Sequence, residues 1–166
     1  LEQSISAAGL LNVTLLGVRS QRQIQRELAE ANLFVLPSIV DRKGACDILP
    51  TVITEAMACG LPVVSTRVSG IPEMVSHGET GLLVEAGDPH ALADAIMELS
   101  VDPARRKAMG EAGRARAEKL FALGVTARQL AEKFEKLPAV SGQPGPSAVG
   151  SKVVYLMNAW DGSRTH

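Results

Sequence analysis

The chain has 166 residues, of which 46% are hydrophobic, 21% are charged and 3% are aromatic, and its formal net charge is −1. This length is sufficient for one domain with a hydrophobic core. The near-neutral charge and the scarcity of aromatic side chains argue against a nucleic-acid groove, which combines positive charge with stacking platforms. The sequence contains no apolar run of about 18 residues and no signal-peptide pattern, so we expect no transmembrane helix and a cytoplasmic location.

Apolar periodicity and helix-ending residues predict alternating helices and strands in the first half of the chain. Pro50 and Gly60 bracket one predicted helix, 50–59, because proline suits the first turn of a helix and glycine accepts the left-handed conformation that ends one. The other elements predicted here are the end of an amphipathic helix in 1–11, strands in 12–17 and 32–38, a helix in 22–30, a loop in 39–49 and a strand in 63–66.

The second half of the chain begins with a helical turn in 71–76, a turn in 77–81 and a short strand in 82–84. Asp88 and Asp102 each precede a proline, a pattern typical of an N-cap residue followed by the first residue of a helix. We therefore predict three helices, in 89–100, in 103–119 and in 122–137.

The composition changes after residue 137. Residues 138–151 are rich in Pro, Gly and Ser, which predicts a flexible linker. A strand is predicted in 152–157, and residues 152–166 form either a tail or the start of another, truncated domain. The first 137 residues are therefore expected to form the folded domain.

Cysteine and histidine contribute no expected metal site. Cys46 and Cys59 are too few for a disulfide framework and lack the spacing of metal ligands, so we expect free thiols in a reducing compartment. The three histidines, His77, His90 and His166, lie in turn-like or terminal sequence, where surface positions are expected.

Short apolar strands that alternate with helices predict an α/β fold with a doubly wound parallel sheet. Sheets of this kind bind ligands in the crevice at the carboxyl ends of their strands. In this chain those ends are predicted at 17–20, 37–49 and 66–72, and the second leads directly into the helix that begins near Pro50.

Glu55 stands in the middle of that otherwise apolar helix, eight positions after Asp47. A carboxylate on a buried helix is costly unless it is paired, so Glu55 either forms an ion pair with an Arg or Lys, or reaches solvent through a gap, or binds a ligand. The helix start can bind phosphate, and Glu55 lies about 7.5 Å farther along the axis, where it could accept hydrogen bonds from a ribose diol. Asp47 would then face a sugar at the other end of an extended sugar–diphosphate–nucleoside.

Four motifs occur in order along residues 1–137: a carboxylate eight positions before the Glu of E-A-M-A-x-G-x-P-V-V, then G-I-P-E, G-x-T-G-x-L-V and G-D-P. With these motifs the chain resembles the donor-binding half of the family 4 (group 1) retaining glycosyltransferases, which have the GT-B fold. The resemblance implies that the fold is the Rossmann-like half of a GT-B enzyme. It also implies transfer of a hexose from a UDP-, GDP- or ADP-sugar to an acceptor hydroxyl, without a metal or other cofactor.

The resemblance assigns roles to individual residues. Glu55 matches the carboxylate that holds the nucleotide ribose, and Asp47 matches a carboxylate that contacts the transferred sugar and is usually Glu, so we treat both as catalytic residues. The loop near the base matches Gly17, Val18 and Arg19, and the turn whose amides meet the diphosphate matches Ile48, Leu49, Pro50 and Thr51. Relatives often have Gly in place of Ile48, and a side chain at this position narrows the approach of the diphosphate to the turn. For the G-I-P-E segment, Gly70–Glu73, we favour a structural role over a role in the donor pocket.

Some parts of the family pattern have no match in this chain. They are the first βα unit, with its Gly-rich turn and basic pair, and the N-terminal acceptor domain, through which peripheral membrane association would occur. We therefore expect a truncated domain that does not transfer sugar by itself. Two alternatives remain open: a nucleotide-binding or interaction module without catalysis, and a sugar-nucleotide epimerase.

Overall fold

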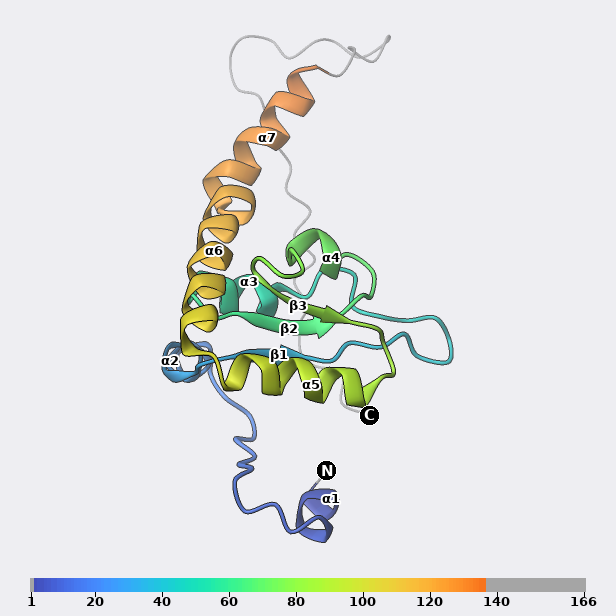
Figure 1. The fold of residues 1–166 in the computed structure, drawn as a ribbon. Helices are drawn as coiled ribbons and strands as arrows, with labels where there is room; N and C mark the ends of the chain where they lie inside the picture. The colour runs from blue at the N-terminus through green and yellow to red at the C-terminus, as the bar shows by residue number, and fades with distance from the viewer. Residues whose placement is uncertain (1, 137–166) are drawn as a thin grey trace. The chain divides into compact units, whose positions relative to one another are not determined.

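The computed structural model describes residues 2–136, and one compact unit comprises Leu1–Arg128 (Figure 1). The described residues form helices and strands in the order α1 (Glu2–Ala7), α2 (Gln21–Glu30), β1 (Phe34–Leu36), α3 (Thr51–Ala58), β2 (Val63–Thr66), α4 (Ile71–Met74), β3 (Gly81–Val84), α5 (Pro89–Ser100), α6 (Pro103–Phe121) and α7 (Leu123–Glu135).

The three strands form one parallel sheet in the order β1-β2-β3. Phe34 is in register with Val63, and Val63 with Gly81. Parallel neighbours require a crossover between consecutive strands, and helices α3 and α4 lie in the two crossovers. The predicted class, an α/β fold with a parallel sheet, is confirmed.

Helices cover both faces of this sheet. Val63 of β2 belongs to a buried cluster with Ile53 and Met57 of α3, whereas its neighbour Val64 belongs to a second cluster with Leu99 of α5. Successive side chains of a strand point to opposite faces, so the two clusters lie on opposite sides of the sheet. Figure 1 shows α3 and α4 on one side and α5 on the other. The sheet is therefore doubly wound, as predicted.

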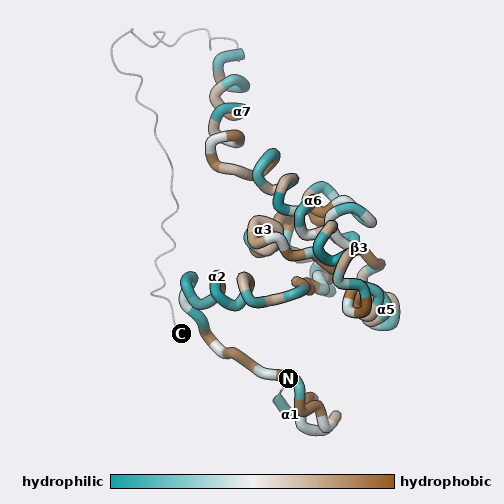
Figure 2. Tube along the Cα trace, turned by 60° about the vertical axis from the view of Figure 1, so that its left-hand side comes forward, coloured by the Kyte–Doolittle hydropathy of each residue, from teal (hydrophilic) through white to brown (hydrophobic). Residues whose placement is uncertain are grey.

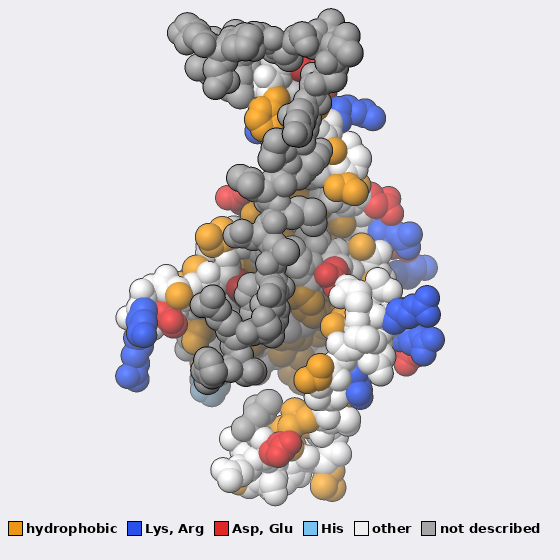
Figure 3. Space-filling model, turned by 180° about the vertical axis from the view of Figure 1, so that it is seen from behind, with side chains coloured by type: hydrophobic (Ala, Val, Ile, Leu, Met, Phe, Trp, Pro, Cys, Tyr) orange, Lys and Arg blue, Asp and Glu red, His pale blue; other side chains and the backbone are white. Residues whose placement is uncertain are grey.

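The strand predicted in 12–17 is wrong. This segment pairs with none of the described strands, and its apolar side chains, Val13, Leu15 and Leu16, are exposed. Figure 2 shows it as a hydrophobic stretch between α1 and α2, and Figure 3 shows hydrophobic side chains on the surface of the same N-terminal part. An extended segment becomes a strand only by hydrogen bonding to a neighbouring strand, which apolar alternation alone does not supply.

Two further predicted elements are shorter than expected. The helix predicted in 1–11 ends at Ala7, and Gly9 adopts a φ of 63° shortly after it. The strand predicted in 32–38 is limited to Phe34–Leu36, because only these three residues pair with β2. The strands β2 and β3 and the helices α5, α6 and α7 lie where they were predicted to within a few residues.

Aspartate caps begin two of the long helices, as predicted. The Asp88 carboxylate accepts a hydrogen bond from the Ala91 amide at 2.9 Å, and the Asp102 carboxylate accepts one from the Arg105 amide at 2.9 Å. Each bond satisfies an N–H group that has no partner within its own helix.

Replacing Asp102 with alanine is therefore expected to lower the free energy of unfolding by about 1 kcal/mol, because the amide loses its acceptor. Asp102→Asn should retain most of the stability, since an asparagine oxygen also caps a helix. Urea unfolding followed by far-UV circular dichroism measures both variants. Equal losses in the two variants would show that the charge of Asp102, and not its hydrogen bond, stabilises α6.

The predicted linker at 138–151 and the predicted strand at 152–157 lie outside the described residues. Among the residues that are described, no helix is both long enough and apolar enough to cross a bilayer.

Candidate functional site

The N-terminus of α3 is the centre of the candidate site. The helix follows the loop that leaves the carboxyl end of β1, and it begins after Pro50, which acts as the N-cap residue and provides no side-chain hydrogen bond. The first amides of a helix have no partner within it and carry a partial positive charge. At the other end, Gly60 adopts the predicted left-handed conformation, with φ of 76°. The start of α3 is thus suited to an anion.

Gly70 holds the turn that leads into α3. Its amide donates a hydrogen bond to the Ile48 carbonyl oxygen at 3.0 Å. A Cβ atom on residue 70 would lie 2.7 Å from that oxygen and 2.7 Å from Cδ2 of Leu49, while its φ of −80° is open to any residue. Gly70 is therefore required for close approach and not for its backbone conformation. Through Gly70, the G-I-P-E segment contacts the turn that leads into α3, and its structural role stays a prediction.

Glu55 is half-buried, and the prediction of a helix buried nearly all round is wrong. In α3 only Ile53, Ala56 and Met57 are buried, and Cys59, which follows the helix, is exposed. The three buried side chains lie on one side of α3, which packs against the sheet and against α6, so the opposite side reaches solvent. Glu55 follows Ile53 by two residues, so it lies on the side of α3 away from the three buried residues.

The partner of Glu55 comes from α2. Nε2 of Gln21, the first residue of α2, lies 3.4 Å from Oε2 of Glu55 and donates a long hydrogen bond to it. No described Arg or Lys forms an ion pair with Glu55. One structural alternative for Glu55, an ion pair, is thus absent among the described residues. The other alternative, access to solvent, agrees with the half-buried position of the carboxylate.

The remaining predicted site residues lie on the surface, apart from one. Pro50 is buried, whereas Asp47, Ile48, Leu49 and Thr51 are exposed. Asp47 forms no hydrogen bond or ion pair with another described residue, so its carboxylate is available to a ligand. The turn thus presents exposed side chains on a backbone fixed by Gly70.

Gly17, Val18 and Arg19 are all exposed, and Gly17 adopts a φ of 65°. They do not follow a strand, so the predicted position of this loop at a carboxyl end of the described sheet is wrong. The loop nevertheless runs into α2, whose first residue contacts Glu55. The structure therefore connects this loop with Glu55 through Gln21.

A family model described as "Glycosyl transferases group 1" matches residues 1–116. The chain belongs to the group 1 glycosyltransferases. The match includes Asp47, Glu55, the turn between them and the loop at 17–19, so all predicted site residues lie within the family's own sequence pattern.

Curated glycosyltransferases resemble the chain over most of its length. It is 42% identical over 125 residues to the amylovoran biosynthesis glycosyltransferase AmsK of Erwinia amylovora, which covers 75% of this chain and 31% of the relative. It is 37% identical over 129 residues to a GDP-mannose-dependent phosphatidylinositol monomannoside mannosyltransferase of Corynebacterium glutamicum, covering 76% of this chain and 33% of the relative. The chain therefore spans about a third of the length of these relatives.

Solved structures of glycosyltransferases share the fold of this domain. The Anabaena protein HepE in complex with UDP matches with a TM-score of 0.73 and 31% identity, over 82% of this chain and 36% of that one. Sucrose-phosphate synthase from Thermosynechococcus elongatus matches with a TM-score of 0.71 and 33% identity, over 81% and 32%. The sheet and these matches confirm the predicted partial Rossmann-like half of a GT-B fold.

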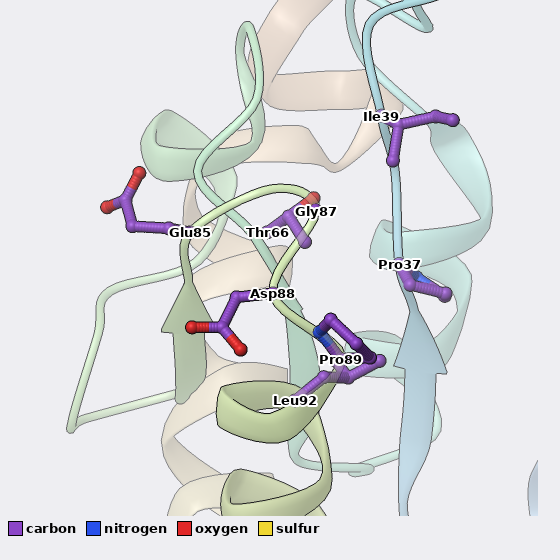
Figure 4. Close-up of a pocket in the computed structure, with 8 residues that line it drawn as sticks. All are labelled: Pro37, Ile39, Thr66, Glu85, Gly87, Asp88, Pro89 and Leu92. Carbon is purple, nitrogen blue, oxygen red and sulfur yellow. The ribbon is translucent and has the colours of Figure 1, made fainter.

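In this group 1 domain, a separate pocket of about 160 Å³ opens at the carboxyl ends of all three strands. Figure 4 shows Pro37 after β1, Thr66 at the end of β2 and Glu85 after β3 around it, with the Glu85 carboxylate directed away from Pro37 and Ile39. None of the predicted site residues lines this pocket. The candidate site is thus an exposed turn and helix start at the same edge of the sheet.

Sequence reasoning missed Gln21, which touches Glu55. The capping box formed by Ser20 and Gln23 marks the start of α2 and could have placed Gln21 in its first turn. Nothing in the sequence indicates that this turn lies beside a residue 34 positions later.

Proposed function

We propose that the domain binds the nucleotide-sugar donor of a retaining glycosyltransferase. The observation that carries this proposal is the exposed turn at the start of α3, fixed by the Gly70–Ile48 hydrogen bond and followed by the half-buried carboxylate of Glu55. The N–H groups of the turn and of the first residues of α3 would receive the diphosphate. Glu55 would accept hydrogen bonds from the ribose hydroxyls, and Asp47 would accept them from the sugar.

The comparisons support a nucleotide-sugar ligand without choosing the base. The structures of Anabaena HepE contain UDP or UDP-glucose, and the Corynebacterium glutamicum relative is named as dependent on GDP-mannose. We propose that the ligand of this chain is a UDP-, GDP- or ADP-sugar, with the base near Gly17, Val18 and Arg19. The remainder of the protein would provide the acceptor site and any contact with a membrane surface.

In the proposed reaction, the bond between the anomeric carbon and the donor phosphate oxygen breaks, and a bond from that carbon to the acceptor oxygen forms on the same face. The acceptor proton passes to the leaving diphosphate, which helps to deprotonate the acceptor. The domain contributes preorganised N–H donors that stabilise the charge on the diphosphate. The reaction as proposed uses no metal or other cofactor.

Two other functions predict different results. A binding module without catalysis would bind the nucleotide, but the protein would form no product. An epimerase would change the sugar without an acceptor, and it would not produce a glycoside.

Isothermal titration of the chain with UDP, GDP and ADP tests donor binding. We expect one of the three nucleotides to bind at least tenfold more tightly than the others, because the loop at 17–19 would contact the base and distinguish one base from another. A transfer assay on the longer protein with the matching sugar nucleotides then tests catalysis, and NMR of the product should show a retained anomeric configuration. Inversion, or no nucleotide binding at all, would contradict the proposal.

A further inference from the structure

Arg116 of α6 binds the end of α4. Its Nε donates a hydrogen bond to the Met74 carbonyl oxygen at 2.9 Å, and its Nη2 donates one to the Glu73 carbonyl oxygen at 2.8 Å. The carbonyls in the last turn of a helix have no partner within that helix, so the guanidinium group satisfies two of them with one planar fork. The side chain of Arg116 is half-buried.

The other end of the same short segment holds the candidate site. Gly70 precedes α4, and its amide donates to Ile48 in the turn before α3. Between the two ends, Ile71 and Met74 are buried in the cluster that also contains Ile53 of α3. The four residues of α4 are therefore fixed by a hydrogen bond to the turn at one end and by Arg116 at the other.

Close packing limits how α4 can move without moving the turn. The Gly70 Cα faces the Ile48 carbonyl oxygen and the Leu49 side chain so closely that no Cβ atom fits between them. A displacement of α4 toward the turn would press on these groups, and a displacement away from it would break the Gly70–Ile48 bond. The position of the turn thus depends on the position of α4.

We propose that Arg116 is a positioning residue of the donor site, which acts on the diphosphate-binding turn through α4 and Gly70. This inference rests on the proposed function, because it assigns to Arg116 a part in nucleotide binding. It does not require Arg116 to touch the nucleotide, since its guanidinium is occupied by the carbonyls of Glu73 and Met74.

The chain contains a matched control for this proposal. Arg106, also on α6, donates from Nη1 to the Leu99 carbonyl at 2.6 Å and to the Ser100 carbonyl at 2.7 Å. It therefore satisfies the end of α5 in the way that Arg116 satisfies the end of α4, but neither α5 nor Arg106 contacts the Ile48 turn through any hydrogen bond of the described residues. Loss of Arg106 removes the same kind of interaction without disturbing the turn.

The experiment compares Arg116→Gln, Arg116→Lys and Arg106→Gln with the unchanged chain. Titration with UDP, GDP and ADP gives the dissociation constant, and hydrogen exchange gives the protection of the Gly70 amide. We expect Arg116→Gln to weaken binding roughly 2- to 30-fold, the range for residues that act through a packed network. Arg116→Lys should weaken it less, because lysine keeps the charge but does not reproduce the planar fork. Arg106→Gln should change it less than twofold.

Hydrogen exchange separates the inference from the proposed function. Both Arg116 variants should exchange the Gly70 amide faster than the unchanged chain, and Arg106→Gln should not, although urea unfolding should show a similar loss of stability in Arg106→Gln and Arg116→Gln. If the unchanged chain binds a nucleotide and the Arg116 variants bind it equally well, the inference is wrong and the proposed function stands. If the unchanged chain binds none of the three nucleotides, the proposed function is wrong, and the positioning role fails with it.

Discussion

Replacing Gly110 with alanine is expected to destabilise the fold by roughly 3 kcal/mol, the upper part of the usual range for overpacking. Gly110 lies in α6, and a Cβ atom there would be 2.0 Å from the carbonyl oxygen of Gly60 and 2.9 Å from its carbonyl carbon. Both contacts are with backbone, which cannot rotate away as a side chain can. The two helices α3 and α6 would have to separate, and the buried cluster between them would loosen.

Gly113 provides the control on the same helix. It is also buried, but a Cβ atom there would meet its nearest neighbours only at 3.8 Å, an ordinary contact distance. Alanine is favoured over glycine in a helix by about 0.5–1 kcal/mol. Gly113→Ala should therefore stabilise the chain slightly, whereas Gly110→Ala should destabilise it strongly.

Urea unfolding of the two variants measures this difference, with the free energy of unfolding obtained by linear extrapolation. A lower free energy of unfolding in Gly110→Ala and a higher one in Gly113→Ala would show that α6 packs directly on the backbone at the end of α3. A Gly110→Ala variant as stable as Gly113→Ala would contradict that close approach.

Replacing Glu55 with glutamine is expected to weaken nucleotide binding by about 1.5–3 kcal/mol, the range for hydrogen bonds to a charged group. The amide keeps the size of the side chain but supplies only one acceptor oxygen and no charge, so it cannot hold a ribose diol as a carboxylate does. Folding should be retained, because Glu55 is only half-buried and its hydrogen bond to Gln21 is long.

Titration calorimetry with the nucleotide that the unchanged chain binds most tightly measures the effect. Glu111→Gln is the matched control, since Glu111 is an exposed carboxylate on α6, paired with Lys107 at 3.9 Å. Its replacement should leave the dissociation constant unchanged. An unchanged affinity in Glu55→Gln would remove Glu55 from the donor site and would leave the ribose without an assigned partner.

Much of the fold could be predicted because its signals are local. Asp88 and Asp102 cap helices through amides three residues away, and Gly60 ends α3 through its own backbone conformation. The strands β2 and β3 are short apolar runs between such signals. Each of these features depends on residues within one or two turns, so the sequence predicts it without knowledge of the fold.

The sequence identified the residues of the candidate site, but it predicted only part of their structural surroundings. The spacing of Asp47 and Glu55, and the turn at Pro50, follow from the motif and from the helix that begins there. The burial of the helix around Glu55 was predicted wrongly, because it depends on which side of α3 packs against the sheet and α6. Apolar residues on several sides of a helix do not determine that side.

Local sequence thus determined the helix starts, the strands β2 and β3, the family pattern and the identity of the carboxylates. Only the tertiary structure decided that residues 12–17 pair with none of the described strands, that Gly70 fits against Ile48, and that Arg116 reaches carbonyls 42 and 43 residues earlier in the chain. The physical reason is that a hydrogen-bond donor or an apolar strand specifies the kind of partner it needs, while the folded arrangement of distant segments determines which partner is within reach.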